Sequence, residues 1–145
     1  MRYLVRVFNT SSNASKYLHD ISLLGYKLDR LEQAKVYMLE GNLKEKDVRL
    51  ICEELLADPI LERYEVNGVL KGKGFSTVNI WYRPEVLDVV AMNVLKAIRY
   101  MGIKTKLDVR SGVQLRFYPR LRKETVDHIV KNFFMNELIQ YHEVF

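Results

Sequence analysis

The feature that most constrains this chain is an internal repeat of its hydrophobic pattern. Apolar residues at helical spacing occur in two sets, and the second repeats the spacing of the first: Val48, Ile51, Cys52, Leu55 and Leu56, then Val126, Ile129, Val130, Phe133 and Phe134. An earlier pair of apolar helical segments ends on Gly25 and on Gly102, and glycine tolerates the left-handed conformation that closes many helices. This self-similarity predicts that one supersecondary unit is present twice.

Each copy predicts the same order of elements. In the first copy we expect strands at 3–8, 27–32, 35–40 and 60–66, and helices at 12–24 and 44–56. In the second copy we expect strands at 76–82, 104–110, 113–118 and 138–144, and helices at 87–101 and 123–134. This βαββαβ order is of the ferredoxin-like type, an α+β fold class in which two helices cover one face of an antiparallel sheet.

The chain therefore divides into repeat 1 at 1–66, a glycine- and lysine-containing linker at 67–75, and repeat 2 at 76–145. A copy of this size buries only about 60% of the surface of its unfolded chain and is marginal alone. We expect the copies to pack as a pseudo-twofold pair resembling a fused dimer, with two sheets that face each other or join at an edge.

Composition excludes several classes of protein. Of the 145 residues, 48% are apolar and 28% are charged, which is typical of a soluble globular chain. No apolar run is long enough to span a bilayer, and Cys52 is the only cysteine, so we expect a cytoplasmic protein without an intramolecular disulfide. No metal-ligand spacing or nucleophile with a paired base is present, and Cys52 lies in an apolar helical stripe. We predict no catalytic residue and no metal or cofactor site.

Positive charge is concentrated in the second copy, which has 11 basic and 7 acidic residues. Much of it lies in the segment Arg116-Phe117-Tyr118-Pro119-Arg120-Leu121-Arg122-Lys123. Basic residues interleaved with aromatics are found where proteins bind phosphates or single-stranded nucleic acid. We interpret the segment as a solvated turn or as a surface for an acidic partner protein, because the central strands lack the exposed aromatics of an RNA-binding sheet.

Several motifs resemble the PurS family, the small subunit of phosphoribosylformylglycinamidine synthase. The segments that carry the resemblance are Leu24-Gly25-Tyr26, Cys52 to Val66 with its Leu-Leu-Ala-Asp-Pro-Ile-Leu-Glu-Arg-Tyr sequence, Arg83-Pro84-Glu85-Val86-Leu87-Asp88, and Val109-Arg110-Ser111-Gly112. The chain departs from the family at Glu85 and Val89, where the family loop has glycine and proline. It also has Val113 where the family has a turn lysine, which the first copy keeps as Lys35.

The resemblance implies a noncatalytic subunit in purine biosynthesis. PurS-like dimers bridge an ATP-dependent synthetase (PurL-like) and a glutaminase (PurQ-like) and help to keep the ammonia path closed. ATP, magnesium and glutamine are then used by the partner subunits, and this chain binds no cofactor. The partner-docking residues that the resemblance indicates are Arg83, Pro84, Glu85, Asp88, Lys35, Arg110, Gly112, Asn136 and Tyr141. Further self-association is compatible with it, whereas a membrane or nucleic acid is not expected.

Two alternatives remain open at this stage. A tandem ACT-type regulatory domain has the same element order and often carries an Arg-Pro-Gly-Val-Leu-like loop that binds an amino acid between two domains. The segment Arg83 to Leu87 resembles that loop, but Glu85 replaces the glycine that permits close approach of the ligand. The other alternative is a basic module that binds nucleic acid.

Overall fold

The computed structural model describes residues 1–9 and 13–145, and it has an α+β fold. Its elements in chain order are β1 (Arg2–Phe8), the 3-10 turn η1 (Ser15–Tyr17), α1 (Leu18–Leu23), β2 (Arg30–Gly41), α2 (Glu45–Ile51), the π-helical turn η2 (Cys52–Leu56), β3 (Arg63–Val66), β4 (Ser76–Tyr82), α3 (Val89–Tyr100), β5 (Leu107–Tyr118), α4 (Lys123–Phe133) and β6 (Gln140–Val144). No described helix combines the length and the apolar character needed to cross a membrane.

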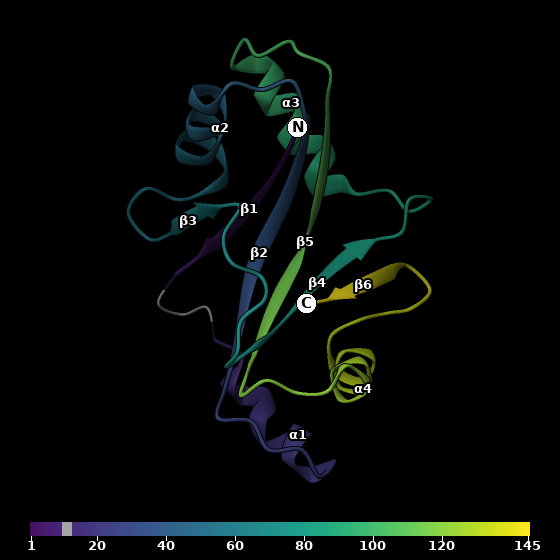
Figure 1. Ribbon diagram of the computed structural model, residues 1–145. Coiled ribbons are helices and arrows are strands. Elements are labelled where there is room, and N and C mark those ends of the chain that lie inside the picture. Colours follow the sequence, from purple (N-terminus) through teal and green to yellow (C-terminus); the bar gives the residue numbers. More distant parts are fainter. Residues whose placement is uncertain (10–12) are drawn as a thin grey trace.

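The described strands form one antiparallel sheet in the order β3-β1-β2-β5-β4-β6 (Figure 1). The two longest strands, β2 and β5, lie in the centre and pair along their whole length, from Arg30 opposite Tyr118 to Gly41 opposite Leu107. Of the two expected arrangements, the sheet portions are therefore joined at an edge and do not face each other.

The predicted βαββαβ order is wrong in one respect. The expected strands 27–32 and 35–40 are the single strand β2, and 104–110 and 113–118 are the single strand β5, so the order in each half is βαβαβ. Small or polar residues near the middle of each strand favour a turn locally. In the structure, β2 and β5 pair with each other along their entire length. A turn within either strand would interrupt this pairing and its backbone hydrogen bonds.

The predicted helices agree with the structure in place and differ in detail. The segment expected as a helix at 12–24 contains η1 and α1, and its first residue lies outside the described residues. Helix α2 is followed directly by η2 within the expected span 44–56. Gly25 and Gly102 follow α1 and α3 with φ angles of 92° and 89°, which confirms the left-handed helix ends.

Two hydrophobic cores lie on the same side of the sheet, which we call the helix face. The first core contains residues of β1, α2 and η2 together with Ala91, Val94 and Ile98 of α3. The second contains residues of β4, β5 and α4 together with Ile21 of α1. Each core thus combines elements from both halves of the chain, with α2 and α3 at one end of the sheet and α1 and α4 at the other (Figure 1).

The segment 67–75 connects β3 at one edge to β4 near the other and crosses the opposite side of the sheet, which we call the linker face (Figure 1). Two arginines anchor the crossing: Arg116 Nη2 donates to the Val69 carbonyl oxygen at 2.7 Å, and Arg120 Nη1 donates to the Gly72 carbonyl oxygen at 2.8 Å. The Phe75 ring lies 5.7 Å from that of Tyr118. Sequence analysis predicted a linker here, and the structure shows that it also covers part of the sheet.

Candidate functional site

Five of the nine predicted docking residues lie around one cleft. Arg83, Pro84, Asp88, Arg110 and Tyr141 line a cleft of about 280 Å³ where β4 ends. These residues come from the loop after β4, from β5 and from β6. Sequence analysis proposed them from separate motifs, and the fold brings them together.

Asp88 fixes the loop 83–88 to the sheet. Its Oδ1 accepts hydrogen bonds from the backbone nitrogen of Ala91 at 3.0 Å and from Ser111 Oγ at 2.7 Å, and its Oδ2 accepts one from the backbone nitrogen of Ser111 at 2.8 Å. The first bond caps the N-terminus of α3, a position that aspartate favours. The other two bonds satisfy the backbone nitrogen and the hydroxyl of Ser111. This residue lies just beyond Gly112, which forms the last pair of the β4–β5 ladder with Trp81.

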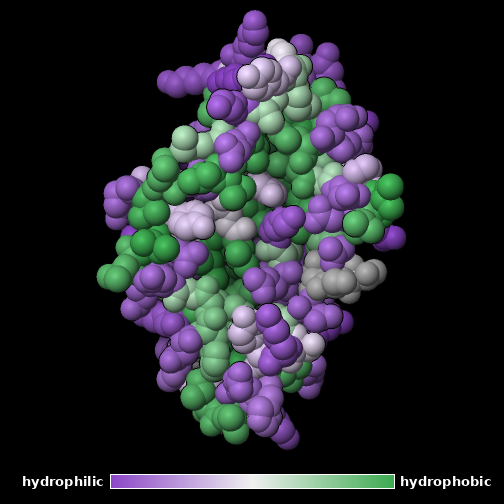
Figure 2. Space-filling view, turned by 180° about the vertical axis from the view of Figure 1, so that it is seen from behind, coloured by the Kyte–Doolittle hydropathy of each residue, from purple (hydrophilic) through white to green (hydrophobic). Residues whose placement is uncertain are grey.

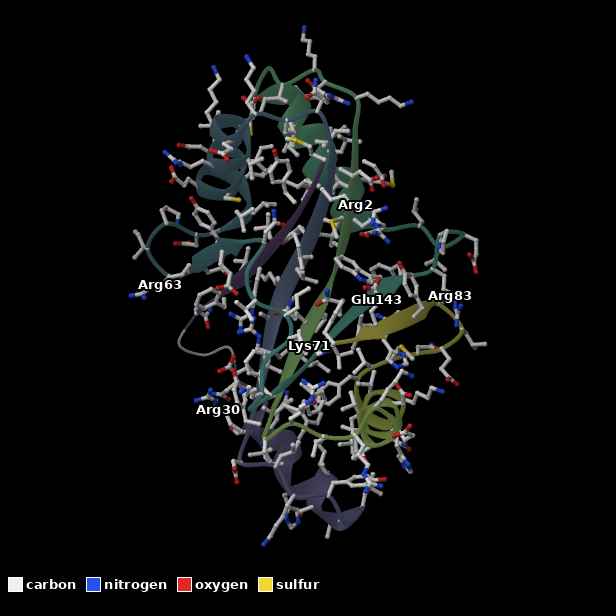
Figure 3. The ribbon with its side chains drawn as sticks, in the orientation of Figure 1. Arg2, Arg30, Arg63, Lys71, Arg83 and Glu143 are labelled. Atoms are coloured by element: carbon white, nitrogen blue, oxygen red, sulfur yellow. The ribbon has the colours of Figure 1, made fainter. Side chains whose placement is uncertain are left out.

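Arg83 connects this loop to the loop before β6. Its backbone nitrogen donates to the Ile139 carbonyl oxygen at 2.9 Å, and its Nε donates to the Glu137 carbonyl oxygen at 2.8 Å. Figure 3 shows Arg83 at the lateral edge of the sheet, beyond β4 and β6. The arginine therefore has a structural role, and it also lines the cleft.

Arg110 is a fixed cation on the floor of the cleft. Its Nη1 donates to the Tyr141 hydroxyl at 2.7 Å, and its guanidinium carbon lies 5.2 Å from the centre of the Trp81 ring. Trp81 is 1% exposed, so the guanidinium stacks on a buried aromatic side chain. Sequence analysis missed Trp81, because nothing local to β4 shows that Arg110 reaches it across the sheet.

Gly112 was predicted to lie in a turn, and this is wrong. It lies within β5, where an added Cβ would clash with the Ile80 carbonyl oxygen and come within 2.9 Å of Trp81 Cε3. Lys35 and Arg110, also predicted at turns, lie in the continuous strands β2 and β5 for the reason given above. Glycine is needed here for close approach of the neighbouring strand and not for a turn.

Lys35 and Gly112 line a second cavity, on the helix face where β2 meets β5. It measures about 380 Å³ and shares Tyr82 with the first cleft. Lys35 Nζ lies 3.4 Å from Glu62 Oε2. Tyr37 also lines the cavity, and burial raises the pKa of its phenol, which keeps the group protonated at neutral pH.

Asn136 shapes the loop before β6. Its side-chain oxygen accepts a hydrogen bond from the Leu138 backbone nitrogen at 3.0 Å, and its own backbone nitrogen donates to Gln140 Oε1 at 2.9 Å. Glu85 is exposed, and among the described residues its side chain has no hydrogen-bond or ion-pair partner. Asn136 therefore positions the loop beside the cleft, while Glu85 is free to contact a partner.

Exposed apolar side chains lie next in sequence to the residues that form the cleft and its loops. Leu87, Val89 and Leu138 are 67%, 56% and 85% exposed. Figure 2 shows hydrophobic surface at both lateral edges of the molecule, where the loops before β3 and β6 lie. Apolar side chains beside fixed arginines are typical of surfaces that bind other proteins.

The arrangement suits binding more than chemistry. Cys52 is fully buried, as predicted, and burial raises the pKa of its thiol to about 11, so it is a poor nucleophile. Among the described residues, no group of three or more His, Cys, Asp and Glu side chains could hold a metal ion. In the cleft itself, the Asp88 carboxylate is already bound by three donors.

Comparison of the chain with protein-family models finds no match, and no curated protein matches it either.

Proposed function

We propose that this chain is a PurS-like, noncatalytic subunit of a cytoplasmic phosphoribosylformylglycinamidine synthase. In this role it bridges a PurL-like synthetase and a PurQ-like glutaminase, and it helps to keep ammonia from reaching water between their sites. ATP, magnesium and glutamine are used by the two partners. The chain contributes surfaces and their relative position, and no reacting group.

The observation that carries the proposal is the register of the central strands. The repeat that relates Val48 to Val126 also relates Lys35 to Val113, and these last two residues pair with each other in the β2–β5 ladder. The ladder extends equally far on either side of this pair, to within one residue. The strand order is also symmetric about the centre of the sheet, because β2 corresponds to β5, β1 to β4 and β3 to β6. Two fused PurS-like repeats related by a pseudo-twofold axis would have this symmetry.

The cleft at the end of β4 provides the second support. A docking surface requires charged groups that hold their positions without a partner, beside apolar side chains that a partner can bury. Arg110 is held by Tyr141 and Trp81, and the loop that carries Glu85 is held by Asp88. Leu138 supplies the apolar surface.

The test is to capture tagged protein from extracts of its own cells, with ATP, magnesium and glutamine present, and to identify the retained proteins by mass spectrometry. Recovery of a glutaminase together with an ATP-dependent synthetase is expected. These two proteins are then purified, and ammonia transfer is compared with and without this chain. Recovery of neither enzyme, at protein concentrations that hold micromolar partners, would overturn the proposal.

Matched variants locate the docking surface in the reconstituted complex. Leu138→Asp adds a charge to the exposed rim of the cleft, and we expect it to weaken association about tenfold or more. Ile60→Asp makes the same kind of change in the loop before β3, where Ile60 is 89% exposed. Equal effects of the two variants would indicate that both edges dock, and no effect of either would exclude these loops from the interface.

The cavity on the helix face favours a second candidate, an ACT-like amino-acid sensor. At about 380 Å³ it is large enough for an amino acid, it lies where the two central strands meet, and Lys35 lines it. A ligand that binds only the folded state raises the melting temperature. A thermal-shift screen of the twenty amino acids tests this candidate, and stabilisation by one of them that Lys35→Gln abolishes would support it.

A further inference from the structure

A third concavity lies apart from both cavities described above, and three basic residues line it. Its volume is about 340 Å³, and it is lined by Lys71, Ser76, Arg120, Leu121, Lys123, Val144 and Phe145. It shares no lining residue with the cleft at the end of β4 or with the cavity on the helix face. In Figure 3, Lys71 lies over the middle of the sheet, well away from Arg83 at its edge.

The three cations in this basic cleft come from three separate parts of the chain. Lys71 belongs to the linker, Arg120 to the turn after β5, and Lys123 to the first turn of α4. No aspartate or glutamate is among the lining residues. Like charges that converge repel one another, and of the three cations only Lys123 has an acidic partner among the described residues, so the cleft has a positive potential that an anion would relieve.

Only part of this charge is neutralised within the described protein. Lys123 Nζ lies 3.1 Å from Asp127 Oδ2. Arg120 uses one nitrogen to donate to the Gly72 carbonyl oxygen, and it forms no ion pair with any described residue. Lys71 has neither a hydrogen bond nor an ion pair with the described residues. Two positive charges are therefore available to a ligand.

The walls of the cleft are held in place by the protein. Ser76 Oγ donates to the Leu121 carbonyl oxygen at 3.3 Å and accepts from the Leu121 backbone nitrogen at 3.0 Å. These bonds connect the start of β4 to the turn that carries Arg120. The bond from Arg120 to Gly72 holds the linker beside that turn. A preformed site binds its ligand with a smaller loss of conformational freedom than a mobile one.

We propose that the basic cleft binds a small phosphorylated molecule through its phosphate group. A phosphate monoester carries about two negative charges at neutral pH, which matches the free charges of Lys71 and Arg120. The planar guanidinium of arginine donates two parallel hydrogen bonds to phosphate oxygens. The volume is in the range of small-molecule sites and limits the ligand to about the size of a nucleotide.

Calorimetric titration of the full chain with inorganic pyrophosphate and with AMP tests the proposal. We expect saturable binding of one ligand per chain. Arg120→Gln should weaken the affinity about tenfold, because it removes the bidentate donor. Lys71→Gln should weaken it about threefold, and it breaks no hydrogen bond or ion pair with the described residues.

The control variant is Lys104→Gln, which removes one charge from an exposed position in the segment before β5. It should leave the affinity for pyrophosphate unchanged. Absence of saturable binding at low salt, or an equal loss of affinity with Lys104→Gln, would overturn the proposal. Tighter binding of a single-stranded RNA than of either phosphate compound would overturn it in favour of a nucleic-acid surface.

Discussion

The loops before β3 and before β6 share two side-chain hydrogen bonds and differ in charge. In the first loop, Asp58 Oδ1 accepts from the backbone nitrogens of Ile60 and Leu61 at 2.8 and 3.0 Å, and the Asp58 backbone nitrogen donates to Glu62 Oε1 at 2.9 Å. In the second loop, Asn136 and Gln140 provide the corresponding side-chain oxygens. The internal repeat relates Asp58 to Asn136 and Glu62 to Gln140.

The position of an oxygen atom determines the shape of the loop. An aspartate and an asparagine both accept hydrogen bonds from amides two residues along the chain, so either residue makes this turn. The charge of these side chains can therefore differ between the β3 edge and the β6 edge of the sheet. Glu62 uses its charge to pair with Lys35, whereas Gln140 lines the cavity on the helix face without a charge.

The largest difference between the halves in the stability cost of a substitution is expected at Gly112 and its counterpart Ala34. Gly112→Ala places a Cβ against the backbone oxygen of Ile80, so we expect a loss of about 1–3 kcal/mol of unfolding free energy. Ala34→Gly adds only backbone freedom and should cost about 0.5–1 kcal/mol. Urea denaturation of both variants measures the difference. Equal losses would show that β4 can move away from β5 at little cost.

A somewhat smaller loss of unfolding free energy is expected when Asp88 is replaced. Asp88→Asn replaces one of the two acceptor oxygens by an amide donor, and a backbone or hydroxyl donor of Ser111 loses its acceptor. We expect a loss of about 1–2 kcal/mol, measured by thermal or urea denaturation. Asp58→Asn is the matched control, because Asn136 already makes the same loop with an amide. A neutral Asp88→Asn variant would mean that the loop 83–88 is not held by this carboxylate.

The two loops should also differ in their response to pH. Two backbone amides donate to the Asp58 carboxylate and lower its pKa below the ordinary value. A lowered pKa in the folded state stabilises the loop above the unfolded pKa of about 3.9, and this stabilisation is lost as the pH falls through the folded value. The protection of the Ile60 amide from exchange, relative to its intrinsic rate at each pH, should therefore fall at acid pH, while the protection of the Leu138 amide should not follow this titration. Asp58→Asn should abolish the difference.

The smallest effect is expected for the charge pair at the first edge. Glu62→Gln gives the first loop the residue that the second loop has, and it removes the partner of Lys35. Lys35 is well exposed, and such pairs contribute at most about 1 kcal/mol. We expect a change below about 0.5 kcal/mol that disappears in high salt. A larger change, measured by urea denaturation at low and high salt, would show that the pair supports the seam between β2 and β5.

Local patterns in the sequence predicted much of the secondary structure. Helical spacing located α3 and α4 to within two residues at either end, and strand β4 has the predicted bounds. Gly25 and Gly102 follow the ends of α1 and α3 as expected, and Asp88 caps the N-terminus of α3. These features depend on contacts within a few residues, where the period of apolar side chains and the chemistry of caps decide the outcome.

The candidate site was predicted in part for the same reason. Motifs indicated Arg83, Asp88 and Arg110, and the structure brings them to one cleft. Trp81 and Ser111 were missed, because their importance comes from contacts across the sheet. The internal repeat could have revealed that Glu62 and Gln140 are counterparts, because Glu62 follows Asp58 by four positions and Gln140 follows Asn136 by four.

Local sequence patterns fix the positions of the helices and show which side chains are apolar. Contacts between the two halves make 30–41 and 107–118 unbroken strands and place α1 and α3 each in a core with elements of the other half. Local preference at Gln33 or Ser111 allows a turn as well as a strand. The choice is made by pairing between two strands that belong to different halves of the chain, which satisfies the backbone of both and buries the helices against one continuous face.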